Sequence, residues 1–477
     1  MTKVSTKNTN VKNRQLYLDM TFLGVILFQV FRIPLTNMIG NEGNGYLAFA
    51  LEVYAVLSLI FGYAVSRVTM KMIKLRSRKH LYQTCSHIFV FSLMISLILS
   101  LLGSVIFFFG ISYVKLNYFP ILAGISFKFF SGLLIISSIS GVFRGYFEGI
   151  GTQVPTAFSK LLEAFIAGTG ALIFTSSLTK YGTKVGALLI NKQYTPAFGA
   201  AGIVLGCICG AVFSLLFLIF IKKIYSYAQN HSKQKGKKDD TFNFKSIFVE
   251  FFRNLAICIG ELLFFKGYRL LNLMIFSNIY TKMIEGENKL LAIVGAYHGK
   301  VLVLITLSVL IILSFTGENI IRIRKNYIKR MTEYSLKYLY EDLKKILIIS
   351  IPVCTFIFAF SKNILTLLYR SASTTEILYL KIASVNVVLV SLGIYFYKVL
   401  RKLEFNISLL VIPVIAFAGQ SIMMYFLVNI ENTRTLSFII AELVFWGLIC
   451  VTEYVVILNA LKPDALKVGS YLKRENE

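Results

Sequence analysis

The chain has 477 residues, of which 56% are hydrophobic and only 15% are charged, and its mean hydropathy is +0.70. Soluble domains carry about 25% charged residues, so the composition excludes a soluble enzyme or binding domain and indicates a polytopic helical membrane protein. The 50 Lys and Arg residues outnumber the 23 Asp and Glu residues. Basic cytoplasmic loops that touch anionic lipid explain this excess, and we expect no nucleic-acid partner.

Twelve apolar stretches are long enough to cross a bilayer as helices. They lie at about residues 17–38, 46–66, 85–111, 118–142, 154–177, 197–221, 250–277, 291–316, 346–368, 377–397, 408–428 and 435–460. The predicted parts are an N-terminal tail (1–16), an N-terminal six-helix lobe (17–221), a basic inter-lobe loop (222–245), a C-terminal six-helix lobe (246–460) and a C-terminal tail (461–477). An even number of helices in each half makes the two halves parallel repeats.

The distribution of basic residues predicts the orientation in the membrane. With the N-terminus inside, 33 of the 50 Lys and Arg residues fall in inner segments, far more than the outer loops hold. Cytoplasmic loops carry such an excess, so we expect both termini and the inter-lobe loop to lie in the cytoplasm.

A short polar stretch, residues 141–149, separates the fourth and fifth apolar runs. Its glycines permit a tight reversal, and its arginine and aromatic residues suit the headgroup level, which predicts an inner loop. Two roles stay open, a structural part of the inner gate and a direct contact with substrate. The predicted gate or hinge residues are Arg144, Gly145, Glu148 and Gly149, together with Pro34, whose ring should kink the first span.

Ionisable side chains inside membrane spans are costly and mark either a transport pathway or an ion pair. Arg32 either lines a cavity or snorkels to the outer interface, and Glu52 lies at a similar depth, so the two are expected to pair. The embedded cations outnumber the embedded acids, which predicts a cavity for an anion such as a phosphate or pyrophosphate headgroup. The candidate substrate-binding residues are Arg32, Glu52, Lys128, Lys160, Glu163, Arg253, Lys266, Arg269 and Lys300.

Three segments resemble one protein family. Residues 143–149 read F-R-G-Y-F-E-G, and P-T-A-F-S at 155–159 and Glu163 follow, which is similar to the R-G-Y-F-Q-G…P-T-A-x-S-x-x-x-E element of polysaccharide-biosynthesis flippases. Residues 32–46 and the G-A-Y-H-G-K segment at 295–300 agree as well. The chain thus resembles the branch of the multidrug/oligosaccharidyl-lipid/polysaccharide (MOP) exporter superfamily that includes stage V sporulation protein B-like proteins and MurJ-type lipid II flippases.

The resemblance implies a MATE/MOP-like all-α fold of two six-helix lobes around a central cavity that opens alternately to each side. It also implies a flippase that translocates an undecaprenyl-pyrophosphate-linked saccharide, lipid II-like or a polysaccharide precursor, across the bacterial cytoplasmic membrane. Cations of the N-terminal lobe, Arg32 among them, would meet the pyrophosphate. Lys160 stands where the family often has Gln, and Ala167 where an arginine is common. Many relatives have two further helices after the twelfth, whereas here the polar stretch 461–477 follows the twelfth predicted span. The identity of the glycan therefore stays open.

Two other hypotheses remain. An ion-coupled exporter of small molecules would use the same fold, with Glu52 or Glu163 titrating, and a membrane scaffold would recruit wall or sporulation enzymes through its basic loops. The four His and six Cys residues have no metal-ligand spacing, and no nucleophile triad is evident. We therefore expect no enzyme activity and no cofactor. The expected partners are the lipid-linked glycan, membrane lipids, and cell-wall or polysaccharide synthesis enzymes.

Overall fold

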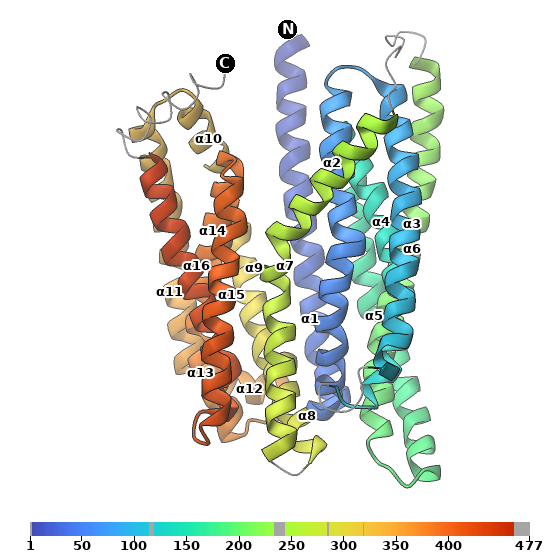
Figure 1. Cartoon of the computed structure of the whole chain (residues 1–477), viewed down its shortest axis with the longest axis vertical. Helices are drawn as coiled ribbons and strands as arrows, with labels where there is room; N and C mark the ends of the chain where they lie inside the picture. The colour runs from blue at the N-terminus through green and yellow to red at the C-terminus, as the bar shows by residue number, and fades with distance from the viewer. Residues whose placement is uncertain (1, 114–118, 233–243, 284–285, 318, 462–477) are drawn as a thin grey trace. The chain divides into compact units, whose positions relative to one another are not determined.

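The structure, a computed structural model, describes residues 2–113, 119–232, 244–283, 286–317 and 319–461, and Figure 1 shows their arrangement. Side chains are described at 20–109, 119–225, 244–281, 286–317 and 319–461. Every regular element in these ranges is a helix, so the predicted all-α class is confirmed. The chain forms two compact units, Met1–Gly299 and Lys300–Glu477, which we describe separately.

Unit 1 contains the longer helices. They are α1 (Thr2–Ser58), the π-helix η1 (Leu59–Tyr63), α2 (Ala64–Ser77), α3 (Tyr82–Tyr113), α4 (Ala123–Ile150), α5 (Val154–Leu188), α6 (Tyr194–Ser232), α7 (Phe244–Met283) and α8 (Glu287–Gly295). A second π-helix, η3 (Ala296–Val301), begins in unit 1 and ends in unit 2. Part of the predicted inter-lobe loop at 222–245 is therefore helical, since α6 continues to Ser232, and residues 233–243 lie outside the described part.

Unit 2 contains shorter helices. They are α9 (Leu302–Ser314), α10 (Ile320–Ile328), α11 (Thr332–Ala359), α12 (Ser361–Tyr369), α13 (Thr374–Ala383), α14 (Val385–Leu403), α15 (Asn406–Asn429), the 3-10 turn η4 (Arg434–Leu436) and α16 (Ser437–Leu461). The start of α13 is set locally by a capping box, in which Ser373 and Glu376 each bind the other's backbone N–H. The unit boundary at Gly299 lies later than the predicted inter-lobe loop, and the assignment of lobes stays a prediction.

Nine helical segments in the described part are long and apolar enough to cross a membrane, and α11 with α12, bent by 77°, makes up to ten. The first of these segments, Met20–Ser77, holds the first two predicted spans. The predicted seventh span, 250–277, lies within α7, which carries several charged residues and is not among these nine segments of the described part. The apolar runs therefore predicted where the helices lie. The predicted spans end too early, because the helices continue through the charged residues that flank the apolar runs.

The break in α1 lies at Gly40 rather than at Pro34. Gly40 has φ 67° and ψ −175°, a backbone conformation that glycine adopts without strain, whereas Pro34 lies inside the helix. The kink predicted at Pro34 stays a prediction. The amide of Asn44 donates to the Gly40 carbonyl at 2.7 Å, which satisfies a backbone acceptor that the break leaves without a helical partner.

Residues 141–149, predicted as an inner loop, are instead the last turns of α4. The helix ends only at Gly151, whose φ of 96° gives a left-handed C-cap, and Pro155 lies in the first turn of α5. The prediction of a loop was wrong because it relied on the polar residues of this stretch and not on the regular spacing of its glycines. Glycines that recur every four residues lie on one helix face, where they let another helix approach closely.

The structure shows which helix makes this approach. A methyl group added at Gly145 would lie 2.4 Å from the Ser66 carbonyl oxygen of α2, and one at Gly149 would lie 2.8 Å from Ile73. The Ser66 hydroxyl donates to the Gly141 carbonyl at 2.5 Å. These glycines therefore fix the packing of α2 on α4, and their predicted role as hinge residues gains no support from the backbone.

Candidate functional site

A junction between α1 and η3 brings together two segments that the sequence resemblance singled out. A methyl group added at Gly45 would lie 2.4 Å from the Leu291 carbonyl oxygen, so the backbones of α1 and α8 touch at this point. The Thr36 hydroxyl donates to the Gly299 carbonyl at 3.1 Å. The π-helical turn of η3 widens the backbone here, as is frequent at functional sites. Both halves of α1 therefore contact one irregular segment.

The charged centre of this junction is the pair formed by Glu52 and His298. The Glu52 carboxylate lies 3.8 Å from Nε2 of His298, and both side chains are buried. The other ring nitrogen, Nδ1, lies 3.1 Å from the Val294 carbonyl oxygen. The distance from Nε2 to Glu52 is longer than a hydrogen bond, so the contact neutralises charge only when the His298 ring is protonated.

Two helices of unit 1, α1 and α7, carry further basic residues at this site. Arg32 on α1 is only 8% exposed and lies one helical turn before Thr36. On α7, Lys266 lies within electrostatic range of both Glu52 and Arg269. We refer to Arg32, Glu52, Lys266, Arg269 and His298 as the α1–α7 cluster. It holds four basic groups against one acid. Four of these five residues were predicted, and the specific pairing of Arg32 with Glu52 stays a prediction.

A second polar cluster connects α4, α5 and α6. Arg144 forms an ion pair with Glu163 and donates to the hydroxyls of Ser159 at 3.1 Å and Ser214 at 2.7 Å. The arginine of the family-like element thus meets the glutamate of that same element. A guanidinium held by three partners on two neighbouring helices stabilises their packing, so the geometry favours the structural role over direct contact with substrate.

The two clusters are joined electrostatically inside unit 1. The Cys207 thiol lies within range of both Arg32 and Glu163, and the Tyr54 hydroxyl lies within range of Glu163 and Arg144. The helices that carry them pack closely, because methyl groups added at Gly202, Gly206 and Gly210 of α6 would each lie within 2.6 Å of the α5 backbone. The polar interior therefore continues from Arg32 to Arg144.

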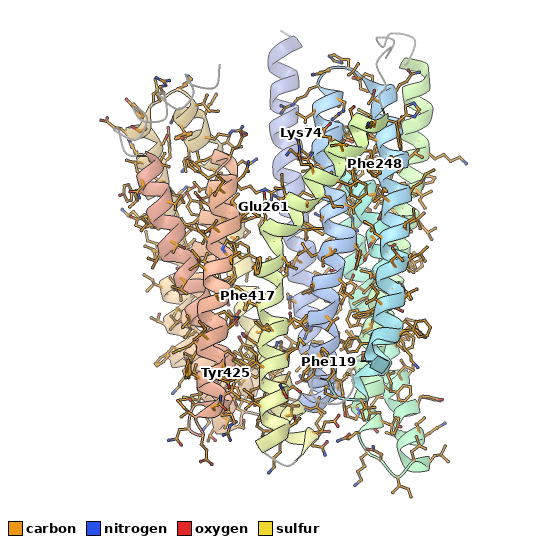
Figure 2. All side chains as sticks on the ribbon, in the orientation of Figure 1. Lys74, Phe119, Phe248, Glu261, Phe417 and Tyr425 are labelled. Carbon is orange, nitrogen blue, oxygen red and sulfur yellow. The ribbon has the colours of Figure 1, made fainter. Side chains whose placement is uncertain are left out.

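A third set of contacts connects α2 to α7. Arg67 lies 2.7 Å from Glu261, and Arg76 lies 2.6 Å from Glu250. Between these pairs Lys71 donates to the Asn254 side chain at 2.8 Å. Figure 1 shows α7 crossing α2, and Figure 2 places Glu261 where α7 changes direction. Arg67, Lys71 and Arg76 escaped the sequence prediction because residues 67–82 were assigned to an inner loop.

Several predicted substrate-binding residues lie elsewhere. Lys128 is exposed on α4, with Nζ 5.8 Å from the centroid of the Phe108 ring, and Arg253 is exposed on α7. Lys300 lies in unit 2, where its ammonium is 2.6 Å from the Glu376 carboxylate. Lys160 on α5 is half-buried and lies within electrostatic range of Glu148, Arg144 and Glu163.

The residue that the sequence prediction missed at the site itself is His298. Its segment was noted for its resemblance to the family, but its packing against α1 was not predicted. The signal was available in the glycines, because a small residue at 45 and another at 295 permit close helix contact. In the described residues no group of three His, Cys, Asp or Glu side chains is placed to hold a metal ion.

Comparison with known proteins supports the fold. No protein-family model matches the chain. Over 219 residues, 44% of this chain and 39% of the relative, it is 25% identical to stage V sporulation protein B of Bacillus subtilis (strain 168). The match thus spans well under half the length of that curated relative.

Solved structures are similar over nearly the whole chain. One is a multidrug resistance MATE family transporter of the MOP superfamily in an inward-facing conformation, with a TM-score of 0.69 and 15% identity over 93% of this chain and 98% of that one. Another is a MOP superfamily transporter from Pyrococcus furiosus, whose binding pocket of reverse polarity suggests a different function; its TM-score is 0.56, with 14% identity over 95% and 96%. These similarities confirm the predicted MATE/MOP-like fold.

Proposed function

We propose that this chain, which has the fold of MOP-superfamily transporters, is a flippase for an undecaprenyl-pyrophosphate-linked saccharide and works by alternating access. The observation that carries the proposal is the α1–α7 cluster, where His298 and Lys266 lie near the carboxylate of Glu52, Arg269 lies near Lys266, and Arg32 is buried on the same helix as Glu52. A net positive site inside a membrane protein suits an anionic headgroup. A pyrophosphate takes hydrogen bonds from several cations at once, and the planar guanidinium of Arg32 matches two of its oxygens.

In the proposed cycle the pyrophosphate replaces Glu52 as the anion that contacts the basic side chains. Glu52 and His298 hold each other while no substrate is bound, so the buried charges stay compensated. An arriving anion would take over His298, Arg32 and Lys266, and the displaced Glu52 would repel it again at release. Because Glu52 competes with the pyrophosphate for the same cations, the site would bind the substrate without preventing its release.

The similar proteins support this reading at a coarser level. The resemblance of residues 143–163 is to polysaccharide flippases, and the curated relative is a stage V sporulation protein. The Pyrococcus transporter indicates that pocket polarity on this fold changes between proteins of different function. We further propose the bacterial cytoplasmic membrane as the location, with both termini in the cytoplasm, and cell-wall or polysaccharide synthesis enzymes as partners.

The test uses purified full-length protein in proteoliposomes that contain an undecaprenyl-pyrophosphate-linked saccharide with a labelled sugar. The rate at which the sugar becomes accessible to a membrane-impermeant reagent reports translocation. We expect Arg32→Gln and Lys266→Gln to lower this rate at least about tenfold, since a charge-assisted contact contributes about 1.5–3 kcal/mol. Lys184→Gln, which removes an exposed lysine of α5, is the matched control. Wild-type rates in both cluster variants would contradict the proposal.

The same experiment separates a second candidate function. The similar structures include multidrug transporters, and Glu52 with His298 forms a titratable pair that an ion-coupled exporter of cations would use. Efflux of a cationic dye that depends on Glu52 and persists in Arg32→Gln would favour this exporter. In cells, the lipid-linked precursor that accumulates when the protein is depleted would identify the saccharide.

A further inference from the structure

Glu453 is a buried carboxyl in the middle of α16, in unit 2. Its side chain is 1% exposed, and it lies eight residues before the end of the helix, or about 12 Å at 1.5 Å per residue. Oε2 is buried and has no hydrogen-bond partner, and within the described residues no ion pair involves Glu453. A bare carboxylate in such surroundings would cost several kcal/mol.

Other buried acids in the described residues differ from Glu453 in this respect. Glu261 pairs with Arg67, Glu376 with Lys300, and Glu52 with His298. Asp342, also in unit 2, accepts hydrogen bonds from the Tyr395 hydroxyl at 3.1 Å and the Asn319 amide at 2.9 Å. Each of these acids is compensated by a partner. Glu453 has no such ion pair or donated hydrogen bond in the described residues. A carboxyl group buried without a cation or a hydrogen-bond donor is stable only in its neutral form.

Within the described residues, no ion pair or hydrogen bond joins the Glu453 side chain to the helices packed against α16. Cys450 lies one turn earlier on α16 and within electrostatic range of Glu453, and Tyr454, which follows Glu453, interacts with Tyr340 of α11. The other titratable groups on the packed helices α11 and α14 include Asp342, Tyr395 and Lys398. None of them forms a described hydrogen bond or ion pair with Glu453. Helix α13, which carries Glu376 and Lys381, lies toward the other end of these helices (Figure 1), and so does Tyr425 of α15 (Figure 2).

We propose that Glu453 is a proton-binding site of unit 2, which holds a proton in the conformation described and releases it when the helices around it rearrange. The bound ion is a proton rather than a metal cation because a metal cation needs several ligands, and in the described residues no group of three His, Cys, Asp or Glu side chains is placed to hold one. The use of this proton to drive transport rests on the function proposed above, whereas protonation itself does not.

The test is infrared spectroscopy of the full chain in nanodiscs, followed through a pH titration. A buried, protonated carboxylic acid gives its own carbonyl stretch, separate from that of carboxylates. We expect this band in the wild type and in Glu431→Gln, which removes an exposed acid near the start of α16, and its loss in Glu453→Gln. The same band in Glu453→Gln would overturn the proposal. Loss of the wild-type band on adding sodium chloride, but not choline chloride, would also overturn it in favour of sodium.

A second measurement does not depend on a variant that folds. Dicyclohexylcarbodiimide, an apolar reagent, modifies protonated carboxyl groups, and mass spectrometry locates its adducts in the wild-type protein. We expect an adduct on Glu453 that disappears as pH rises, and none on exposed Glu431. A chain that stays unmodified at Glu453 at every pH would refute the site. A wild type that shows the band and the adduct but moves no lipid-linked saccharide would leave the proton site standing and refute the flippase.

Discussion

The guanidinium of Arg67 on α2 lies 2.7 Å from the carboxylate of Glu261 on α7, and the two side chains are 13% and 7% exposed. A pair this buried is stable only as a pair, because either partner alone would leave an uncompensated charge in apolar surroundings. The contact therefore holds α7, which carries Lys266 and Arg269, against α2, which follows α1, the helix of Arg32 and Glu52, through η1. The position of the α1–α7 cluster depends on it.

This dependence gives a first prediction. Glu261→Gln should lower the free energy of unfolding by about 3 kcal/mol, since it leaves Arg67 buried without its acid. The double variant Arg67→Met/Glu261→Leu should recover most of this loss, because two apolar side chains of similar size remove both charges. Unfolding by SDS titration in detergent micelles measures both. A double variant as unstable as the sum of its single variants would show that the two residues act independently.

The packing of α2 on α4 gives a second prediction. Gly145→Ala should destabilise the protein by about 1–3 kcal/mol, because the added methyl group would lie 2.4 Å from the Ser66 carbonyl oxygen and force the helices apart. Gly132→Ala is a control on the same helix, where a methyl group would meet nothing within 4 Å. Thermal unfolding of the two variants should differ. Equal melting temperatures would mean that the glycine face does not set this packing.

An aromatic cage around Lys222 gives a third prediction. Its ammonium on α6 lies 2.8 Å from the centroid of the Phe89 ring and 4.7 Å from that of Tyr146. Cation–π contacts of this kind contribute about 1–2 kcal/mol when they are shielded from water. Lys222→Gln should therefore lower the free energy of unfolding by about that amount, and the neighbouring exposed Lys223→Gln should not. An equal effect of both substitutions would point to a loss of general positive charge instead.

The α1–α7 cluster gives a fourth prediction, which concerns geometry rather than charge. Arg32→Lys keeps the positive charge but loses the planar fork that matches two phosphate oxygens. We expect it to weaken binding of undecaprenyl pyrophosphate about tenfold, close to the effect of Arg32→Gln, as measured by isothermal titration of the protein in nanodiscs. If Arg32→Lys bound as the wild type does, Arg32 would act as a point charge.

The fold was predictable because the bilayer permits few architectures for a chain with this composition. Arg32 and Glu52 were singled out as ionisable residues inside membrane spans, and both are buried in the structure. What failed was the boundary between helix and loop at 67–82 and 141–149, since polar residues at the ends of membrane helices look like loop residues. Contacts between side chains that are distant in the sequence could not be predicted, for a different reason. Nothing local connects Glu52 to His298, or Lys300 to Glu376, because side chains in contact need no regular spacing along the chain.

The π-helical turn of η3 also sets a limit on how the chain length can vary. Such a turn holds one residue more than an α-helical turn, and each residue of an α-helix advances the side chains by about 100°. Deleting one residue between Ala296 and Val301 would restore a regular helix and rotate the side chains that follow. The contact of His298 with Glu52 and that of Lys300 with Glu376 could then no longer both form. In descendants of this gene, we expect insertions and deletions to accumulate in the connecting segments and to be absent from these six codons.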